Sequence, residues 1–113
     1  QKLHTSSREV VEAIDGGLPR DLEKRFGAGD KGIYTQRLHD SRGKRNVKNL
    51  TARYAEERLL RSRINGYIRL FERLLDSLAE MPGGSATIDD VLASQNGQVY
   101  LMLAEVAGRV PEA

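Results

Sequence analysis

The stretch that decides the fold is LRSRINGYIRLFERLLDSLAEM, residues 60–81. Apolar side chains recur in it at alternating intervals of four and three residues. A repeat of this kind places one apolar seam along an α-helix, because seven residues make about two helical turns. The stretch therefore predicts a long helix that buries this seam. The seam residues, together with the apolar neighbours beside them, are Leu60, Ile64, Tyr67, Ile68, Phe71, Leu74, Leu75 and Leu78.

The apolar arc is wider than a two-stranded coiled coil requires. Ile68, Leu70 and Leu75 lie beside the heptad positions, at sites that a coiled-coil dimer fills with charged residues. A single partner helix would leave part of this arc uncovered. We expect the remainder to pack against short helices of the same chain or against another chain.

The helix that carries the seam is expected to extend over about residues 46–81. No proline interrupts this range and Gly66 is its one poor helix former, although Glu57 breaks the apolar pattern. The PGGS turn at 82–85 ends it. Such a helix would be about 54 Å long, whereas a compact globule of this chain length is about 35 Å across. The sequence thus predicts an elongated molecule, or a helix end that a partner covers.

Shorter helices are expected before the long one. Ser6 and Glu9 form a capping-box pattern that predicts a helix start, and Gly16–Gly17 is a natural helix stop. LPRDLEKRFG, residues 18–27, predicts a second short helix with proline near its start and glycine near its end. Residues 33–43 are ambiguous, and a short helix is one interpretation.

The C-terminal segment, residues 87–110, is expected to form a helical arm. Asn96–Gly97 interrupts it, either as a kink or as a boundary between two helices. A buried strand at 98–106 is the alternative, because five consecutive apolar residues occur there. Since the turn at 82–85 is short, the arm should run antiparallel to the long helix.

These elements predict an all-α fold: an elongated antiparallel helical hairpin, or small helical bundle, with one long central helix and short N-terminal helices. The chain of 113 residues is expected to be a single domain. Because it begins at Gln1 rather than Met, we expect it to be a piece of a longer polypeptide. Its parts are short helices and a turn (1–32), a basic junction (33–53), the long helix (46–81) and the arm (87–110).

Positive charge gathers where a loop enters the long helix. Residues 31–53 hold seven basic residues and one acidic residue, whereas residues 64–113 hold three basic and seven acidic residues. A cluster of this kind attracts phosphates or an acidic protein surface. Few aromatic residues are interleaved with it, which argues against a platform that stacks single-stranded bases. The candidate docking or nucleic-acid-binding residues are Lys31, Arg37, Arg42, Lys44, Arg45, Lys48 and Arg53.

Patterns that carry chemistry are weak in this chain. There is no cysteine, and the two histidines, His4 and His39, have no partners at metal-ligand spacing. GAGDKG at 27–32 matches a dinucleotide-binding spacing, but a helical pattern precedes it where a strand is required. We therefore expect no catalytic residue, no metal site and no cofactor.

Acidic residues recur along one face of the long helix. Glu72 and Asp76 each follow an arginine by three residues, so we expect ion pairs with Arg69 and Arg73. No run of eighteen apolar residues is present, so the sequence predicts no transmembrane segment. No signal peptide is visible either, and a cytoplasmic location is favoured.

The function that these observations favour is a non-catalytic helical module for protein–protein interaction or oligomerisation, with a basic docking segment. Self-association or a protein partner would cover the remaining apolar arc. One alternative is a helical nucleic-acid-binding domain that uses residues 31–53. A second alternative is a regulatory domain of a larger enzyme.

Overall fold

The structure is a computed structural model that describes residues 2–108. It contains α1 (Lys2–Asp15), α2 (Arg20–Gly27), α3 (Ile33–Asp40), α4 (Lys44–Glu56), α5 (Arg58–Ala79), α6 (Gly84–Ala93) and α7 (Gln95–Val106). No strand occurs within these residues, so the all-α prediction is confirmed and 98–106 is helical. The last residues of the expected arm, 109 and 110, lie outside the described range.

The helix expected over 46–81 is divided at Glu57, whose backbone is extended (φ −101°, ψ 106°). Arg53 fixes this corner, because its guanidinium bonds both Glu57 carboxylate oxygens at 2.6 and 2.9 Å and the Ile14 carbonyl at 2.8 Å. Arg61 donates to the Ala55 carbonyl at 3.1 Å, which satisfies an end of α4 that the helix itself leaves unbonded.

The break changes the overall shape. The longest continuous helix is α5, with 22 residues, and the whole molecule measures 42 × 34 × 22 Å. The chain folds into a compact bundle, and no helix overhangs it as a 54 Å helix would. Within residues 2–108 there is therefore no overhanging helix end of the kind that a partner was expected to cover.

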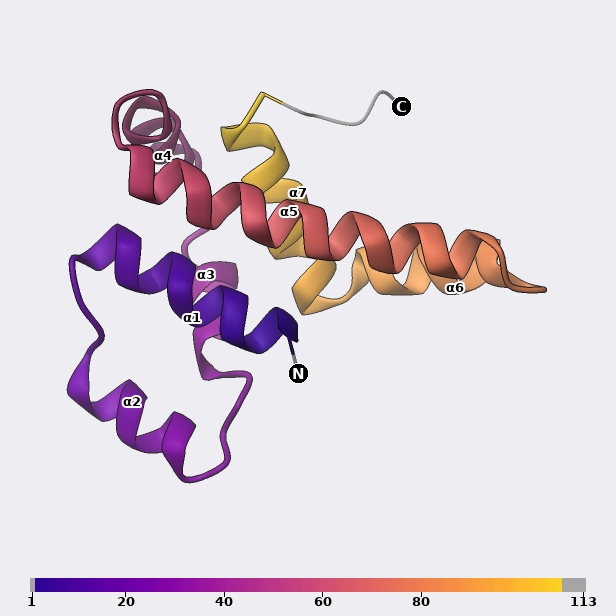
Figure 1. Cartoon of the computed structure of the whole chain (residues 1–113), viewed down its shortest axis with the longest axis horizontal. Coiled ribbons are helices and arrows are strands. Elements are labelled where there is room, and N and C mark those ends of the chain that lie inside the picture. The colour runs from indigo at the N-terminus through magenta and orange to yellow at the C-terminus, as the bar shows by residue number, and fades with distance from the viewer. Residues whose placement is uncertain (1, 109–113) are drawn as a thin grey trace.

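The core lies around the first half of α5. Figure 1 shows α5 crossing the molecule, with α1 along it and α7 crossing it. Val10 of α1 and Leu103 of α7 are fully buried there. The Phe71 ring stacks on Tyr100 at a centroid distance of 4.5 Å. The N-terminal helix α1, together with α7, thus covers the first part of the seam, and one of the two expectations, that short helices of the same chain would cover it, is confirmed there.

The chain reverses direction after α5, and α6 returns beside it as an antiparallel hairpin (Figure 1). Gly84 allows the start of α6 to lie directly against the end of α5, because a Cβ at that position would lie 1.8 Å from the Leu78 carbonyl oxygen. The expected hairpin is present, but only α6 forms its second arm. A second break at Ser94, two residues before the expected Asn96–Gly97, turns α7 back across α5.

Two expected helix starts are wrong. Ser6 lies inside α1, which begins at Lys2, and Glu9 pairs with Arg63 of α5 instead of capping its own helix. Thr87, where the C-terminal arm was expected to begin, lies inside α6, which begins at Gly84. In both cases the pattern resembles a cap, but the helix begins three or four residues before it.

Polar contacts attach α2, which has no buried side chain. Its Glu23 carboxylate accepts from the Arg8 guanidinium at 2.6 and 3.0 Å and from the Tyr34 hydroxyl at 2.9 Å. Burial, reinforced by this carboxylate, raises the pKa of Tyr34 to about 12. Lys31 lies 4.4 Å above the ring of Phe26. The GAGDKG segment is thus a turn between α2 and α3.

Candidate interaction surfaces

The predicted seam divides into two parts of different exposure. Its first five members, Leu60, Ile64, Tyr67, Ile68 and Phe71, are all at most 1% exposed. Its last three, Leu74, Leu75 and Leu78, are half-buried. The first part is therefore core that the chain itself covers. Only the second part, beyond Phe71, is accessible to a partner.

The exposed part of the seam continues around the hairpin end, which we define as Leu78, Met81 and Ile88. Met81 is 59% exposed, and the other two are half-buried. Other partly buried apolar residues of the hairpin pack against the core, namely Leu74, Leu75, Val91 and Leu92. The three residues of the hairpin end do not pack against the core. In Figure 1 this end of the hairpin extends away from the other helices. Within residues 2–108, Met81 and Leu59 are the two large apolar side chains that are mostly exposed, and only Met81 has partly exposed apolar neighbours outside the core cluster, Leu78 and Ile88, in the same hairpin.

Four of the seven candidate basic residues have structural partners. Arg37 pairs with Asp15 at 2.8 Å and Arg53 holds the corner at Glu57. Arg42 donates to the His39 carbonyl at 2.9 Å and to Gln98 at 3.0 Å. Lys31 lies on the Phe26 ring, as described above. Each of these four side chains thus makes a contact within the fold.

The other three, Lys44, Arg45 and Lys48, lie together at the start of α4. All three are exposed, and none forms an ion pair or hydrogen bond with another residue in the described part of the chain. The first turn of α4 holds no acidic residue. Because the N-terminal end of a helix dipole is also positive, this cluster is a centre of uncompensated positive charge. We refer to it as the α4 basic cluster.

Opposite charges lie at opposite ends of the molecule. Residues 42–53 contain five basic residues and no acidic one, whereas residues 72–90 contain five acidic residues and one basic residue. Figure 1 shows α4 at one end of the long axis and the α5–α6 hairpin at the other. The charge asymmetry expected from the sequence is thus arranged along the longest dimension.

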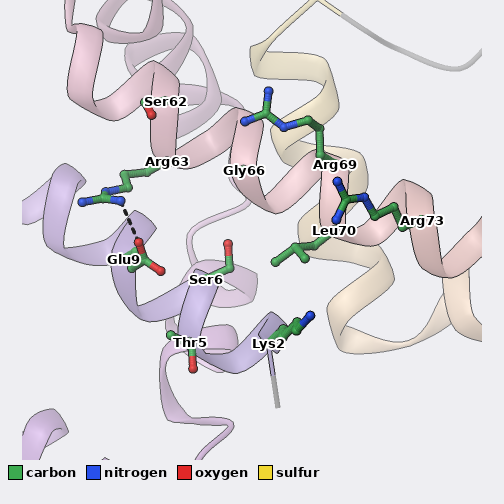
Figure 2. Close-up of a pocket in the computed structure, with 10 residues that line it drawn as sticks. All are labelled: Lys2, Thr5, Ser6, Glu9, Ser62, Arg63, Gly66, Arg69, Leu70 and Arg73. Atoms are coloured by element: carbon green, nitrogen blue, oxygen red, sulfur yellow. Dashed lines mark hydrogen bonds and ion pairs between the residues drawn. The ribbon is translucent and has the colours of Figure 1, made fainter.

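A groove between α1 and α5 is a further candidate site, which sequence reasoning missed. It has a volume of about 590 Å³, and Figure 2 shows it between the two helices. Arg63 donates to Glu9 across it at 2.7 Å. The expected pairs of Arg69 with Glu72 and of Arg73 with Asp76 do not form, and both arginines line the groove instead. The sequence feature that could have indicated the groove is Gly66, a poor helix former one turn before Arg69 in the middle of α5.

Both histidines have local explanations. His4 is half-buried, with Nδ1 3.5 Å from the Thr35 hydroxyl, and burial lowers its pKa. His39 lies 3.5 Å from the carboxylate of its neighbour Asp40. Across residues 2–108, no group of three or more histidine, cysteine or acidic side chains is placed to hold a metal ion. Among the helices described, none is both long and apolar enough to cross a membrane.

Comparison with known proteins adds no assignment to this geometry. No family model matches the chain, and neither a curated protein nor a solved structure matches it.

Proposed function

We propose that this chain is a non-catalytic helical module that associates with protein, and that its partner is a second copy of itself. The observation that carries this proposal is the hairpin end, where apolar side chains remain uncovered. Met81 alone exposes 59% of its surface. Covering such side chains removes apolar surface from water, which is the main driving force of association.

The charge distribution favours a second copy as the partner. Two copies side by side in antiparallel orientation would place each α4 basic cluster near the acidic hairpin of the other. Such a pair has two-fold symmetry and closes on itself, because the same two surfaces meet twice. Charge complementarity of this kind fixes the orientation and speeds association.

The experiment is the molecular mass in solution by light scattering, at about 0.1 M and about 1 M salt. Screening lengths of about 10 Å and 3 Å separate the electrostatic from the apolar contribution. We expect a dimer at the lower salt concentration and weaker association at the higher one. A monomer at both salt concentrations, at protein concentrations of about 100 µM, would overturn the proposal. The dissociation constant would then exceed about 100 µM, which means a binding free energy of less than about 5.5 kcal/mol.

A matched pair of variants locates the surface. Met81→Asp changes an apolar residue in the hairpin end, and Leu59→Asp changes one that is 60% exposed at the opposite end of α5. Because the two residues are equally exposed, both variants should fold. Met81→Asp should yield monomer while Leu59→Asp leaves the dimer intact. Equal effects of the two variants would contradict the assignment of the surface.

Nucleic-acid binding is the alternative that the same protein can test. If the α4 basic cluster binds phosphates, a mixed duplex DNA should bind with submicromolar affinity near physiological salt. Replacement of Lys44, Arg45 and Lys48 by alanine would then abolish the binding, and the logarithm of affinity would fall with the logarithm of salt concentration by about 2.7 for three phosphates. Such a result, with a monomeric protein, would replace the proposal by this alternative.

A further inference from the structure

We infer that the groove between α1 and α5 binds a small ligand that carries two or more phosphate charges. This site is separate from the hairpin end and does not depend on self-association. Its volume, about 590 Å³, lies in the range of about 300–1,000 Å³ that is usual for small-molecule sites. Figure 2 shows the lining side chains on both walls, with Leu70 extending between them.

The first observation is an excess of positive charge without partners. Lys2 from α1 and Arg69 and Arg73 from α5 line the groove. None of the three forms an ion pair or hydrogen bond with any residue from 2 to 108. Arg69 and Arg73 are four residues apart on one helix, where like charges repel. A bound anion would relieve that repulsion.

The second observation is a hydroxyl, that of Ser6, which faces the groove. Ser6 is only 7% exposed, and its hydroxyl makes no hydrogen bond within the part of the chain that the structure covers. Figure 2 shows this oxygen on the groove side of α1. The oxygen itself is accessible, because Asn96 Oδ1 is the one buried side-chain polar atom without a partner among residues 2–108. The Ser6 hydroxyl can therefore donate to an oxygen of a ligand in the groove.

The third observation is Gly66, which lines the groove in the middle of α5. Glycine there costs about 1 kcal/mol relative to alanine. Its φ is not positive, and a Cβ at this position would meet nothing within 4 Å, so neither backbone conformation nor helix packing requires it. The absent side chain instead leaves space in the groove beside Arg69.

The chemistry of the lining selects the ligand class. Arginine forks bond phosphate oxygens in pairs, lysine adds a point charge, and a hydroxyl donates a further hydrogen bond. Two arginines one turn apart on one wall, with a lysine on the other wall, match at least two phosphate groups. None of the lining residues is aromatic, so the groove offers no surface on which bases of a nucleic-acid strand would stack. A small polyphosphorylated molecule fits better than a strand.

The test is calorimetric titration of the whole chain with inorganic pyrophosphate, with inorganic phosphate as the comparison. Pyrophosphate should bind at least ten-fold more tightly than phosphate. The double variant Arg69→Gln/Arg73→Gln should weaken pyrophosphate binding at least ten-fold. Arg58→Gln is the matched control, because Arg58 is an exposed arginine on the same helix outside the groove, and it should leave binding unchanged.

Gly66→Ala separates binding from folding. This variant should unfold at the same or a higher temperature, because alanine favours the helix, yet bind pyrophosphate several-fold more weakly because its methyl group occupies the groove. Undiminished binding by Gly66→Ala would overturn the role of the glycine.

Three further outcomes would overturn the site itself. They are the absence of pyrophosphate binding, an equal loss of binding in Arg58→Gln, and tighter binding of a single-stranded RNA that requires Arg69 and Arg73. Light scattering of the double variant should show the same mass as the original chain. The two proposals can therefore fail independently. A monomeric protein would not contradict the phosphate site, and an absence of pyrophosphate binding would not contradict self-association.

Discussion

The two halves of α5 follow the same apolar repeat but have different surroundings. The first half, through Phe71, is covered by α1 and α7, and its seam residues are at most 1% exposed. The second half lies against α6, and its seam residues are half-buried. The difference teaches that a heptad pattern identifies the residues that need cover. It does not identify the element that provides the cover, or whether the same chain provides all of it.

The largest expected effect comes from deleting a side chain in the first half. Phe71→Ala should lower the free energy of unfolding by about 3–5 kcal/mol, because it leaves a cavity between the rings of Tyr67 and Tyr100. Leu78→Ala in the second half should cost about 1 kcal/mol, since its side chain is already partly in water. Urea denaturation measures both. Similar losses for the two would mean that the halves do not differ as the structure indicates.

The next effect concerns the turn that joins α5 to α6. Gly84→Ala should lower the free energy of unfolding by about 1–3 kcal/mol, because its Cβ would overlap the Leu78 carbonyl and force the hairpin open. Gly66→Ala on the same helix pair should instead raise it by up to about 1 kcal/mol. Thermal unfolding of the two variants provides the measurement. If alanine at 84 leaves the melting temperature unchanged, the helices are further apart than the structure has them.

A smaller effect is expected where α4 turns away from α5. Arg53→Met keeps the aliphatic stem but loses the bonds to Glu57 and to the Ile14 carbonyl. The expected loss is about 1 kcal/mol, because the guanidinium is partly exposed and water screens the pair. Arg37→Met, which breaks an exposed pair with Asp15, is the control and should cost less. An equal cost for the two would show that the corner at Glu57 does not depend on Arg53.

The smallest expected effect is the pH dependence of the free energy of unfolding. It arises in α1, which covers the first half of α5, and in α2, which is bonded to α1. The Arg8 guanidinium lowers the pKa of Glu23, and burial lowers the pKa of His4. Since both pKa values are lower in the folded protein, each group stabilises the fold above its unfolded pKa, about 4.3 and 6.5, and loses this contribution as the pH falls through the folded value.

The free energy of unfolding should therefore decline from pH 7 to pH 4. Amide hydrogen exchange in α1 and α2 should increase first, because His4 and Glu23 lie in these helices. In Glu23→Gln the decline should be shallower. If the decline is as large as in the original chain, Glu23 does not contribute to the pH dependence.

Much of the fold could be predicted because its signals are local. Proline at 19 and glycine at 27 bound α2 within one residue, and the PGGS turn separates the two arms of the hairpin. The repeat from Leu60 onward identified the core-facing side of α5. Each of these features depends on residues close together in the chain, whose conformational preferences act before any tertiary contact forms.

The sequence showed Glu57 only as an interruption of the apolar pattern, and neither the helix break at this residue nor the groove could be predicted in the same way. Arg53 reaches the Ile14 carbonyl, 39 residues away in the chain, and Arg63 reaches Glu9 across 54 residues. The arginines of the groove were expected to pair with acids three residues away, a local rule that the structure does not follow. A spacing in the sequence shows which partners are near along the chain but not which competing partners the fold brings closer.

The sequence by itself therefore determined the all-α class, the hairpin turn and the residues of α5 that must be buried. Only the tertiary structure decided which half of the seam remains accessible, which cations find no partner among residues 2–108 and where a groove opens beside Gly66. The physical reason is that helix periodicity and capping act over a few residues, whereas burial and charge pairing depend on helices that meet from distant parts of the chain.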